Sequence, residues 1–118
     1  MTCTNHALEL LEIAAKAADD ALGLDPLALD VSEQLYLADI FFLVTADNPR
    51  HSRSIAEEIT TEIKKATGQL PVATEGELGS GWVVVDYGDL VVHVLQPEER
   101  DFYALDKLWD KSPRLVTA

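Results

Sequence analysis

Two runs of β-branched residues in the C-terminal half of the chain constrain its fold more than any other feature. Residues 82–86 read Trp-Val-Val-Val-Asp and residues 90–95 read Leu-Val-Val-His-Val-Leu, with Tyr87 and Gly88 between them. Such runs, separated by a short segment that contains glycine, are typical of a β-hairpin. We predict a hairpin in which Tyr87 and Gly88 are the two turn residues.

Alternation along the two predicted strands separates two faces, because successive side chains point to opposite sides of a sheet. One face is purely aliphatic and is predicted to be core: Val83, Val85, Leu90, Val92 and Val94. The other is predicted to pair Trp82 with His93, Val84 with Val91 and Asp86 with Asp89, and to continue to Leu95. An aromatic residue, a histidine and acids around an aliphatic strip are typical of a protein-binding patch. A helix that covers this face, with Trp82 packed beneath it, explains the same pattern.

The rest of the chain alternates between helical and strand-like periodicity. The predicted elements are a helix from Asn5 to Leu22 with Gly23 as its stop, strands at 27–31 and 38–46, a helix from Ser52 or Ser54 to a stop at Gly68, a strand at 70–74, and a last helix that opens at Gln96 and Pro97. The apolar stripe of the first helix is predicted to be Leu8, Leu11, Ala15, Ala18 and Leu22. The strands at 38–46 and 70–74 are predicted to run parallel in one sheet, joined by the second helix.

The order α-β-β-α-β-β-β-α predicts one mixed-sheet α/β domain that spans residues 1–118. Its core is expected within about residues 5–110, and residues 112–118 are expected to form a loose tail. A length of 118 residues leaves little room for a second core.

Charge narrows the choice of partner. The chain has 21 acidic and 9 basic residues, a formal net charge of −12, which argues against broad electrostatic binding of nucleic acid. Nine of the acids lie within residues 1–49, and Lys16 is the one Lys or Arg in that segment. A solvated acidic surface is one interpretation of this excess, and an acidic face that docks on a basic protein is the other.

Targeting and redox features are sparse. The sequence has no apolar run of about 18 residues, which excludes a membrane span, and its N-terminal residues do not have the pattern of a signal peptide. Cys3 is the sole cysteine, so no internal disulfide can form. We therefore expect a cytoplasmic protein.

Catalytic and metal sites are weakly indicated. Asp86 and Asp89, if they face one another, could bind a divalent cation, although acids beside a hairpin turn commonly stabilise the turn itself. Asp47, His51, Ser52 and Ser54 lie close together in the sequence, but a loop-to-helix junction explains the serines as helix caps better than as nucleophiles.

Of two further segments with features of an anion site, one could bind an anion. Arg50, His51 and Arg53 form a small positive cluster that could hold an anion beside the second helix. The glycines Gly76, Gly79 and Gly81 do not form a phosphate loop, because they lead into a strand and no Lys-Ser or Lys-Thr pair follows. We expect no cofactor and no metal.

Several segments of this chain occur in a recognisable order. They are Ala28-Leu-Asp-Val31, Ala38-Asp39, Arg50-His51-Ser52 before Ile55-Ala56, Glu75-Gly76, the run from Trp82 to Val94, and Glu99-Arg-Asp-Phe-Tyr-Ala-Leu-Asp-Lys-Leu-Trp109. Read together, from about Leu8 to Trp109, they resemble the ribosomal silencing factor family, also called the Iojap-like family. Each piece is weak alone, and their order makes the match specific.

The resemblance implies a translational repressor that is not an enzyme. It implies binding to ribosomal protein uL14 on the large (50S) subunit, a block on joining of the small subunit in stationary phase or starvation, a homodimer when free, and a nucleotidyltransferase-like fold without catalytic residues. The residues that we expect to contact uL14 are Trp82, Val84, Asp86, Tyr87, Asp89, Val91, His93 and Leu95. A factor for large-subunit assembly is the closer alternative, and an active nucleotidyltransferase is the more distant one.

Overall fold

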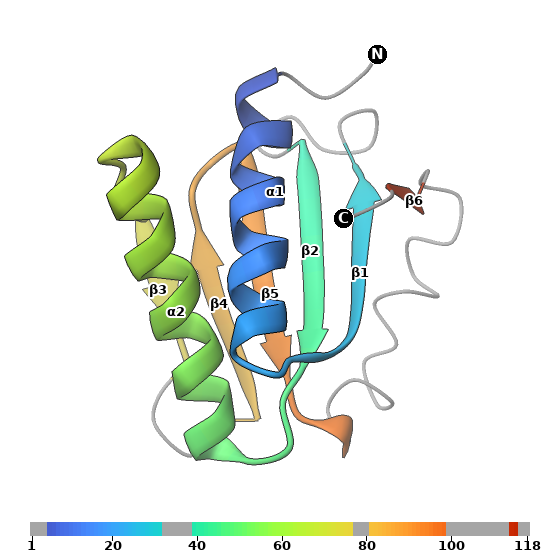
Figure 1. Cartoon of the computed structure of the whole chain (residues 1–118). Helices are drawn as coiled ribbons and strands as arrows, with labels where there is room; N and C mark the ends of the chain where they lie inside the picture. Colours follow the sequence, from blue (N-terminus) through green and yellow to red (C-terminus); the bar gives the residue numbers. More distant parts are fainter. Residues whose placement is uncertain (1–4, 32–38, 77–80, 99–113, 116–118) are drawn as a thin grey trace.

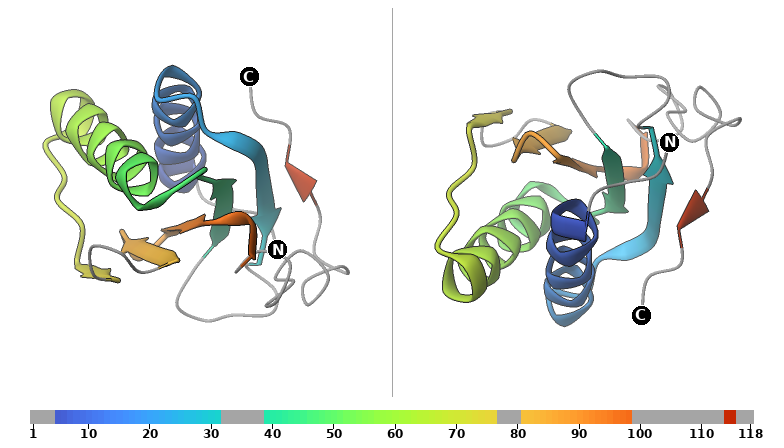
Figure 2. Two further views of the ribbon diagram at one scale, coloured as in Figure 1. Left: turned by 90° about the horizontal axis from the view of Figure 1, so that it is seen from below. Right: turned by 90° about the horizontal axis from the view of Figure 1, so that it is seen from above.

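The computed structural model describes residues 5–31, 39–76, 81–98 and 114–115, and it places two helices against one face of a single sheet (Figures 1 and 2). The elements are α1 (Asn5–Asp20), β1 (Leu24–Asp30), β2 (Ile40–Thr45), α2 (Pro49–Thr67), β3 (Ala73–Glu75), β4 (Trp82–Asp86), β5 (Leu90–Leu95) and β6 (Arg114–Leu115). This order confirms the predicted mixed α/β arrangement as far as β5. Pro97 and Glu98 are helical, and the rest of the predicted last helix lies outside the described residues.

The sheet has the strand order β3-β4-β5-β2-β1-β6. β2 and β5 are parallel neighbours, and every other neighbouring pair is antiparallel. It follows that β3 runs parallel to β2, as predicted for two strands joined by α2. The two strands are not adjacent, however, because the β4–β5 hairpin lies between them.

The main core lies between the helices and the sheet. α1 buries mostly alanines there, which allows its backbone to approach the strands closely. The predicted stripe is partly wrong: Leu11, Ala15 and Ala18 are buried, whereas Leu8 is 39% exposed and Leu22 is 76% exposed. Neither α1 nor α2 is long and apolar enough to cross a membrane.

The end of α1 differs from its prediction. Leu22 has a left-handed φ of 64° and lies beyond the last helical residue, which explains its exposure. Gly23, the predicted stop, is required for a different reason: there is no room for a side chain, because a Cβ at this position would lie 2.5 Å from Val44 Cγ2 on β2.

The start of α2 also corrects the sequence interpretation. Asn48 is the N-cap in place of Ser52 or Ser54, and its side chain accepts a hydrogen bond of 2.9 Å from the backbone N–H of His51. Pro49 occupies the first turn, where its missing N–H is not required. The predicted stop at Gly68 is confirmed, with a φ of 76° and an N–H that donates to the Lys64 carbonyl.

The expectation of a loose tail over residues 112–118 is wrong at Arg114–Leu115, which forms β6. This short strand pairs antiparallel with β1 at Ala28 and Leu29. Its backbone pairs with an edge of β1 that would otherwise leave N–H and C=O groups without ladder partners.

Candidate functional site

The β4–β5 hairpin has a different register from the one predicted. Trp82 lies opposite Leu95, Val84 opposite His93, and Asp86 opposite Val91. The predicted pairs of Trp82 with His93, Val84 with Val91 and Asp86 with Asp89 are therefore wrong, since each residue of β4 pairs two positions further along β5.

The turn explains this shift. Tyr87 N–H donates to the Leu90 carbonyl at 2.8 Å, so the two turn residues are Gly88 and Asp89 rather than Tyr87 and Gly88. Gly88 has a φ of 86°, and positive φ at the first central position alone is the type II′ form that right-twisted hairpins favour. The Asp86 carboxylate accepts a 2.7 Å hydrogen bond from Gly88 N–H and stabilises that turn.

A shift of two residues leaves the faces unchanged, because side chains alternate with a period of two. The predicted core face is confirmed: Val85, Leu90, Val92 and Val94 are buried under α1 and α2, and Val83 packs against them. The face that points away from these helices is called the opposite face below (Figure 2).

Residues of four strands line up in rows across the opposite face. Val84 on β4 is followed by His93 on β5, Leu43 on β2 and Leu27 on β1. The next row carries Asp86, Val91, Phe41 and Leu29 in the same strand order. Leu95 belongs to this face and is fully buried there in a second small core with Leu29, Val31 and Leu43.

Burial divides the predicted contact residues into accessible and inaccessible ones. The partly exposed members on the opposite face are Trp82, Val84, Asp86 and Val91, and we call these four the strip. Leu95 is 0% exposed and His93 is 7% exposed, so both can support the strip but present almost no surface themselves.

Tyr87 and Asp89 are not members of the strip. Tyr87 is 3% exposed within the main core on the helix side, and burial raises the pKa of its hydroxyl to about 12. It therefore does not belong to the strip, contrary to the sequence assignment. Asp89 is partly exposed in the turn, where its carbonyl accepts hydrogen bonds from the N–H groups of Asp39 and Ile40 at the start of β2.

His93 supports Trp82 from within the sheet. The Trp82 indole Nε1–H donates a 3.1 Å hydrogen bond to His93 Nδ1, and the Phe41 ring lies 4.7 Å from the imidazole, measured between centroids. Burial lowers the pKa of His93 to about 4, against a smaller opposing effect of the Asp86 charge. The imidazole is therefore neutral at pH 7.

Two residues that border the strip were not among the predicted contact residues. Phe41 lies in a continuously apolar run, which gives no alternation from which its face could be inferred. Glu75 is exposed on β3 and pairs with Val84, a position that depends on the β3–β4 register. Glu75 adds a carboxylate beside the strip, in the same row as Val84.

The structure also shows where the residues of the possible metal site and of the possible catalytic triad lie. Asp86 faces Val91 and not Asp89, and no group of three His, Cys, Asp or Glu side chains in the described ranges is placed to hold a metal ion. His51 Nδ1 accepts from the Asp47 N–H and its Nε2 donates to the Ala21 carbonyl, each at 2.9 Å. The imidazole thus ties the end of α1 to the start of α2.

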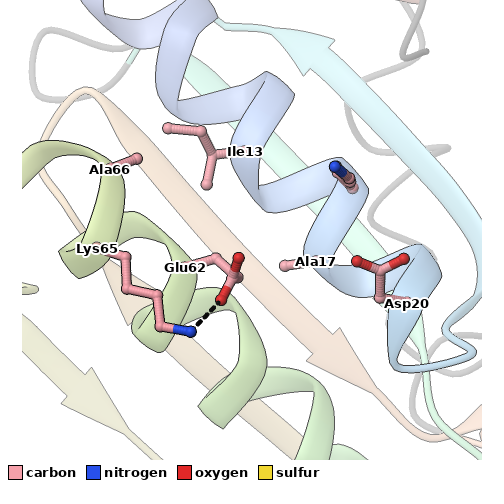
Figure 3. Close-up of a pocket in the computed structure, with 7 residues that line it drawn as sticks. Ile13, Ala17, Asp20, Glu62, Lys65 and Ala66 are labelled. Atoms are coloured by element: carbon pink, nitrogen blue, oxygen red, sulfur yellow. Dashed lines mark ion pairs between the residues drawn. The ribbon is translucent and has the colours of Figure 1, made fainter.

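A shallow pocket lies between the two helices on their outer side (Figure 3). Its lining residues are Ile13, Lys16, Ala17, Asp20, Glu62, Lys65 and Ala66. Glu62 and Lys65 pair with each other at 3.3 Å, and both are substantially exposed. The pocket lining includes no histidine, cysteine, serine or threonine.

Comparison with known proteins places the chain in a family. The family model described as "Ribosomal silencing factor during starvation" matches residues 4–118. The chain belongs to the ribosomal silencing factor family. Its membership confirms the resemblance inferred from the segments around Trp82 to Val94, and the family is named for a regulatory factor rather than an enzyme.

Individual relatives agree with the family match. The ribosomal silencing factor RsfS of Bacillus subtilis is 38% identical over 104 residues, which cover 88% of this chain and 87% of that protein. A crystal structure of a Chromobacterium violaceum protein superposes with a TM-score of 0.83 at 32% identity, over 94% of this chain and 91% of that one. A mouse protein named "Mitochondrial assembly of ribosomal large subunit protein 1" is 29% identical over 87 residues, 72% of this chain and 38% of that protein.

Proposed function

We propose that this chain is a cytoplasmic translational repressor that binds ribosomal protein uL14 on the large (50S) subunit and blocks joining of the small subunit during starvation or stationary phase. Family membership carries this proposal, since the family is described as silencing ribosomes during starvation. The strip supplies a surface of the kind that a protein partner requires.

The chemistry of the strip suits a basic protein surface. Trp82, Val84 and Val91 offer partly exposed apolar area on the opposite face. Carboxylates lie next to it: Glu75 in the row of Val84, Asp86 in the row of Val91, and Asp89 in the adjoining turn. Burial of an aromatic anchor at the centre of an interface typically contributes about 2 kcal/mol or more, whereas exposed ion pairs contribute about 0–1 kcal/mol each. Trp82 therefore provides most of the affinity, and the carboxylates select a partner rich in Arg and Lys.

The net charge of −12 has a second consequence on the ribosome. Ribosomal RNA repels an acidic protein, so binding away from a basic protein patch is disfavoured. Once docked, the domain occupies volume that the small subunit needs, and silencing follows from steric exclusion with no chemical step.

When free, the protein is proposed to be a homodimer. Light scattering during size-exclusion chromatography tests this directly, because a dimer has twice the chain mass of 13.0 kDa. A monomer mass at micromolar concentration contradicts it.

The proposal is tested by sedimentation of purified large subunits with this protein through a sucrose gradient. The parent protein travels with the subunits, and Trp82→Ala loses at least about 30-fold in affinity, the equivalent of about 2 kcal/mol. Leu8→Ala is the matched control, since Leu8 is a 39% exposed apolar residue on α1. Failure of the parent to sediment with subunits, or equal binding by Trp82→Ala, refutes the proposal.

Charge selection needs its own variants. Asp89→Asn removes one of the carboxylates near the strip while nearly preserving the size of the side chain. Glu12→Gln on α1 is its control. We expect Asp89→Asn to weaken binding by up to about fivefold at low salt and less at high salt, because exposed ion pairs are screened. If binding by Asp89→Asn and by Glu12→Gln depends equally on salt, Asp89 is not part of the interface.

A role in large-subunit assembly is the second candidate, and the name of the mouse relative favours it. The two roles differ in timing: an assembly factor acts on precursors, and a silencing factor acts on mature subunits. Cells that lack an assembly factor accumulate immature large subunits during growth. Normal subunit profiles in such cells, together with inhibited joining of mature subunits in vitro, support silencing.

A further inference from the structure

Trp82 is the largest side chain of the strip, and a hydrogen bond to His93 holds its indole ring. Its indole Nε1–H donates to His93 Nδ1 at 3.1 Å, and the two rings are tilted by 44° with centroids 5.9 Å apart. Trp82 lies opposite Leu95 and diagonal to His93, so the bond runs between neighbouring strands along the sheet surface. A partly exposed indole without this contact could adopt other rotamers.

His93 is unusually well suited to hold another side chain. It is 7% exposed and Phe41 lies against its ring, so its own position is fixed by packing. Because Nδ1 accepts the indole N–H, the proton of the neutral ring must be on Nε2. Within the described part of the chain, Nε2 is buried without a hydrogen-bond partner. A buried polar ring that accepts a hydrogen bond from Trp82 and leaves its Nε2 unsatisfied among the described residues is explained poorly by stability alone.

We propose that His93 is a positioning residue for partner binding, which holds the Trp82 indole through its Nδ1 acceptor in the orientation that meets the partner. This inference rests on the proposed function, in which Trp82 is the anchor. A ring that is already oriented loses less conformational entropy on binding, so preorganisation of Trp82 increases the affinity for the partner.

The inference predicts a spectroscopic signature in the unbound parent protein. Nitrogen-15 NMR of the histidine rings should find His93 as the Nε2–H tautomer at pH 7. The indole N–H of Trp82, assigned with Trp82→Phe, should exchange slowly with solvent and shift when His93 is replaced. Finding His93 as the Nδ1–H tautomer overturns the inference. The tautomer is measured on the parent protein, so this test does not depend on whether a His93 variant folds.

Binding to large subunits provides the second arm, with two substitutions at one position. His93→Leu keeps a similar volume and removes the acceptor, and we expect binding to weaken about five- to tenfold, which corresponds to about 1.0–1.4 kcal/mol. His93→Asn places an amide oxygen near the position of Nδ1 and should restore binding to within about twofold of the parent. Circular dichroism confirms that each variant is folded.

The outcomes separate the inference from the function on which it rests. Equal binding by Trp82→Ala and the parent overturns the proposed surface and the role of His93 with it. Weak binding by Trp82→Ala, together with unchanged binding by His93→Leu, overturns the positioning role alone. Equally weak binding by His93→Leu and His93→Asn also overturns it, because packing rather than the acceptor would then be responsible.

Discussion

His93 should make the stability of the domain depend on pH in a way that one substitution removes. Its folded-state pKa is about 4, whereas an unfolded histidine titrates near 6.5. Between these values the unfolded chain binds a proton that the folded domain does not, so the free energy of unfolding falls as the pH falls. Above about pH 6.5 this contribution is fully present, and below about pH 4 it is fully lost.

The magnitude follows from the gap between the two pKa values. Each unit of pKa is worth about 1.4 kcal/mol, so the full loss is about 3 kcal/mol and the loss between pH 7 and pH 5 is about 2 kcal/mol. His93→Leu abolishes this titration while leaving the 21 acidic residues in place. The difference in unfolding free energy between parent and variant therefore isolates His93.

Urea unfolding followed by far-ultraviolet circular dichroism at pH 7, 6 and 5 measures that difference. We expect the parent to lose about 2 kcal/mol more than His93→Leu across this range. Parallel pH dependences for the two proteins would refute the reasoning, because they would mean that His93 titrates alike in the folded and unfolded states.

Three further substitutions, with one control variant, test local features of the fold by the same urea titration at pH 7. Asn48→Ala removes the α2 cap and should cost about 1 kcal/mol, and no change would mean that the bond from His51 N–H contributes nothing. Gly76→Ala should cost about 2 kcal/mol or more, because its Cβ would lie 2.6 Å from the Trp82 carbonyl at a φ of 105°. Gly88→Ala is the control for this variant, has open space at a φ of 86° and should cost less. Leu22→Gly should stabilise the domain by about 0.5–1 kcal/mol, since leucine there has a φ of 64° and is 76% exposed; a loss of stability would contradict this account of the α1 end.

The faces of the hairpin were predictable and its register was not. Alternation assigns Val85 and Trp82 to different faces whatever the pairing, because any shift by two residues preserves the faces. Register depends on which residues form the turn, and Tyr87-Gly88 and Gly88-Asp89 both contain the glycine that a tight turn needs. The hydrogen bond from Gly88 N–H to Asp86 favours the second choice, and it is visible only in three dimensions.

Burial within the candidate site depends on tertiary packing. Trp82 and Leu95 both lie on the opposite face, yet Leu95 is fully buried and Trp82 remains partly exposed. The alternation of residues along the strands does not distinguish them, whereas the structure places Leu95 in a buried cluster with Leu29 and Leu43 and places Trp82 at the margin of that cluster. The cap at Asn48 is different: the Asn-Pro pair before the helix was a readable signal, because proline is favoured at the first helical position.

The short strand β6 illustrates a third limit on what can be predicted from the sequence. Arg114–Leu115 is too short to show any period, and its strand conformation arises from pairing with β1. Sequence patterns predict elements that bury a face of their own, and they miss strands that form only because an edge is available.

Joining of ribosomal subunits tests the central claim most directly. Light scattering of large and small subunits mixed with magnesium should show less association in the presence of the parent protein, and nearly full association with Trp82→Ala at the same concentration. Leu8→Ala should inhibit as the parent does. Undiminished association with the parent, or inhibition by Trp82→Ala equal to that of the parent, would contradict the account.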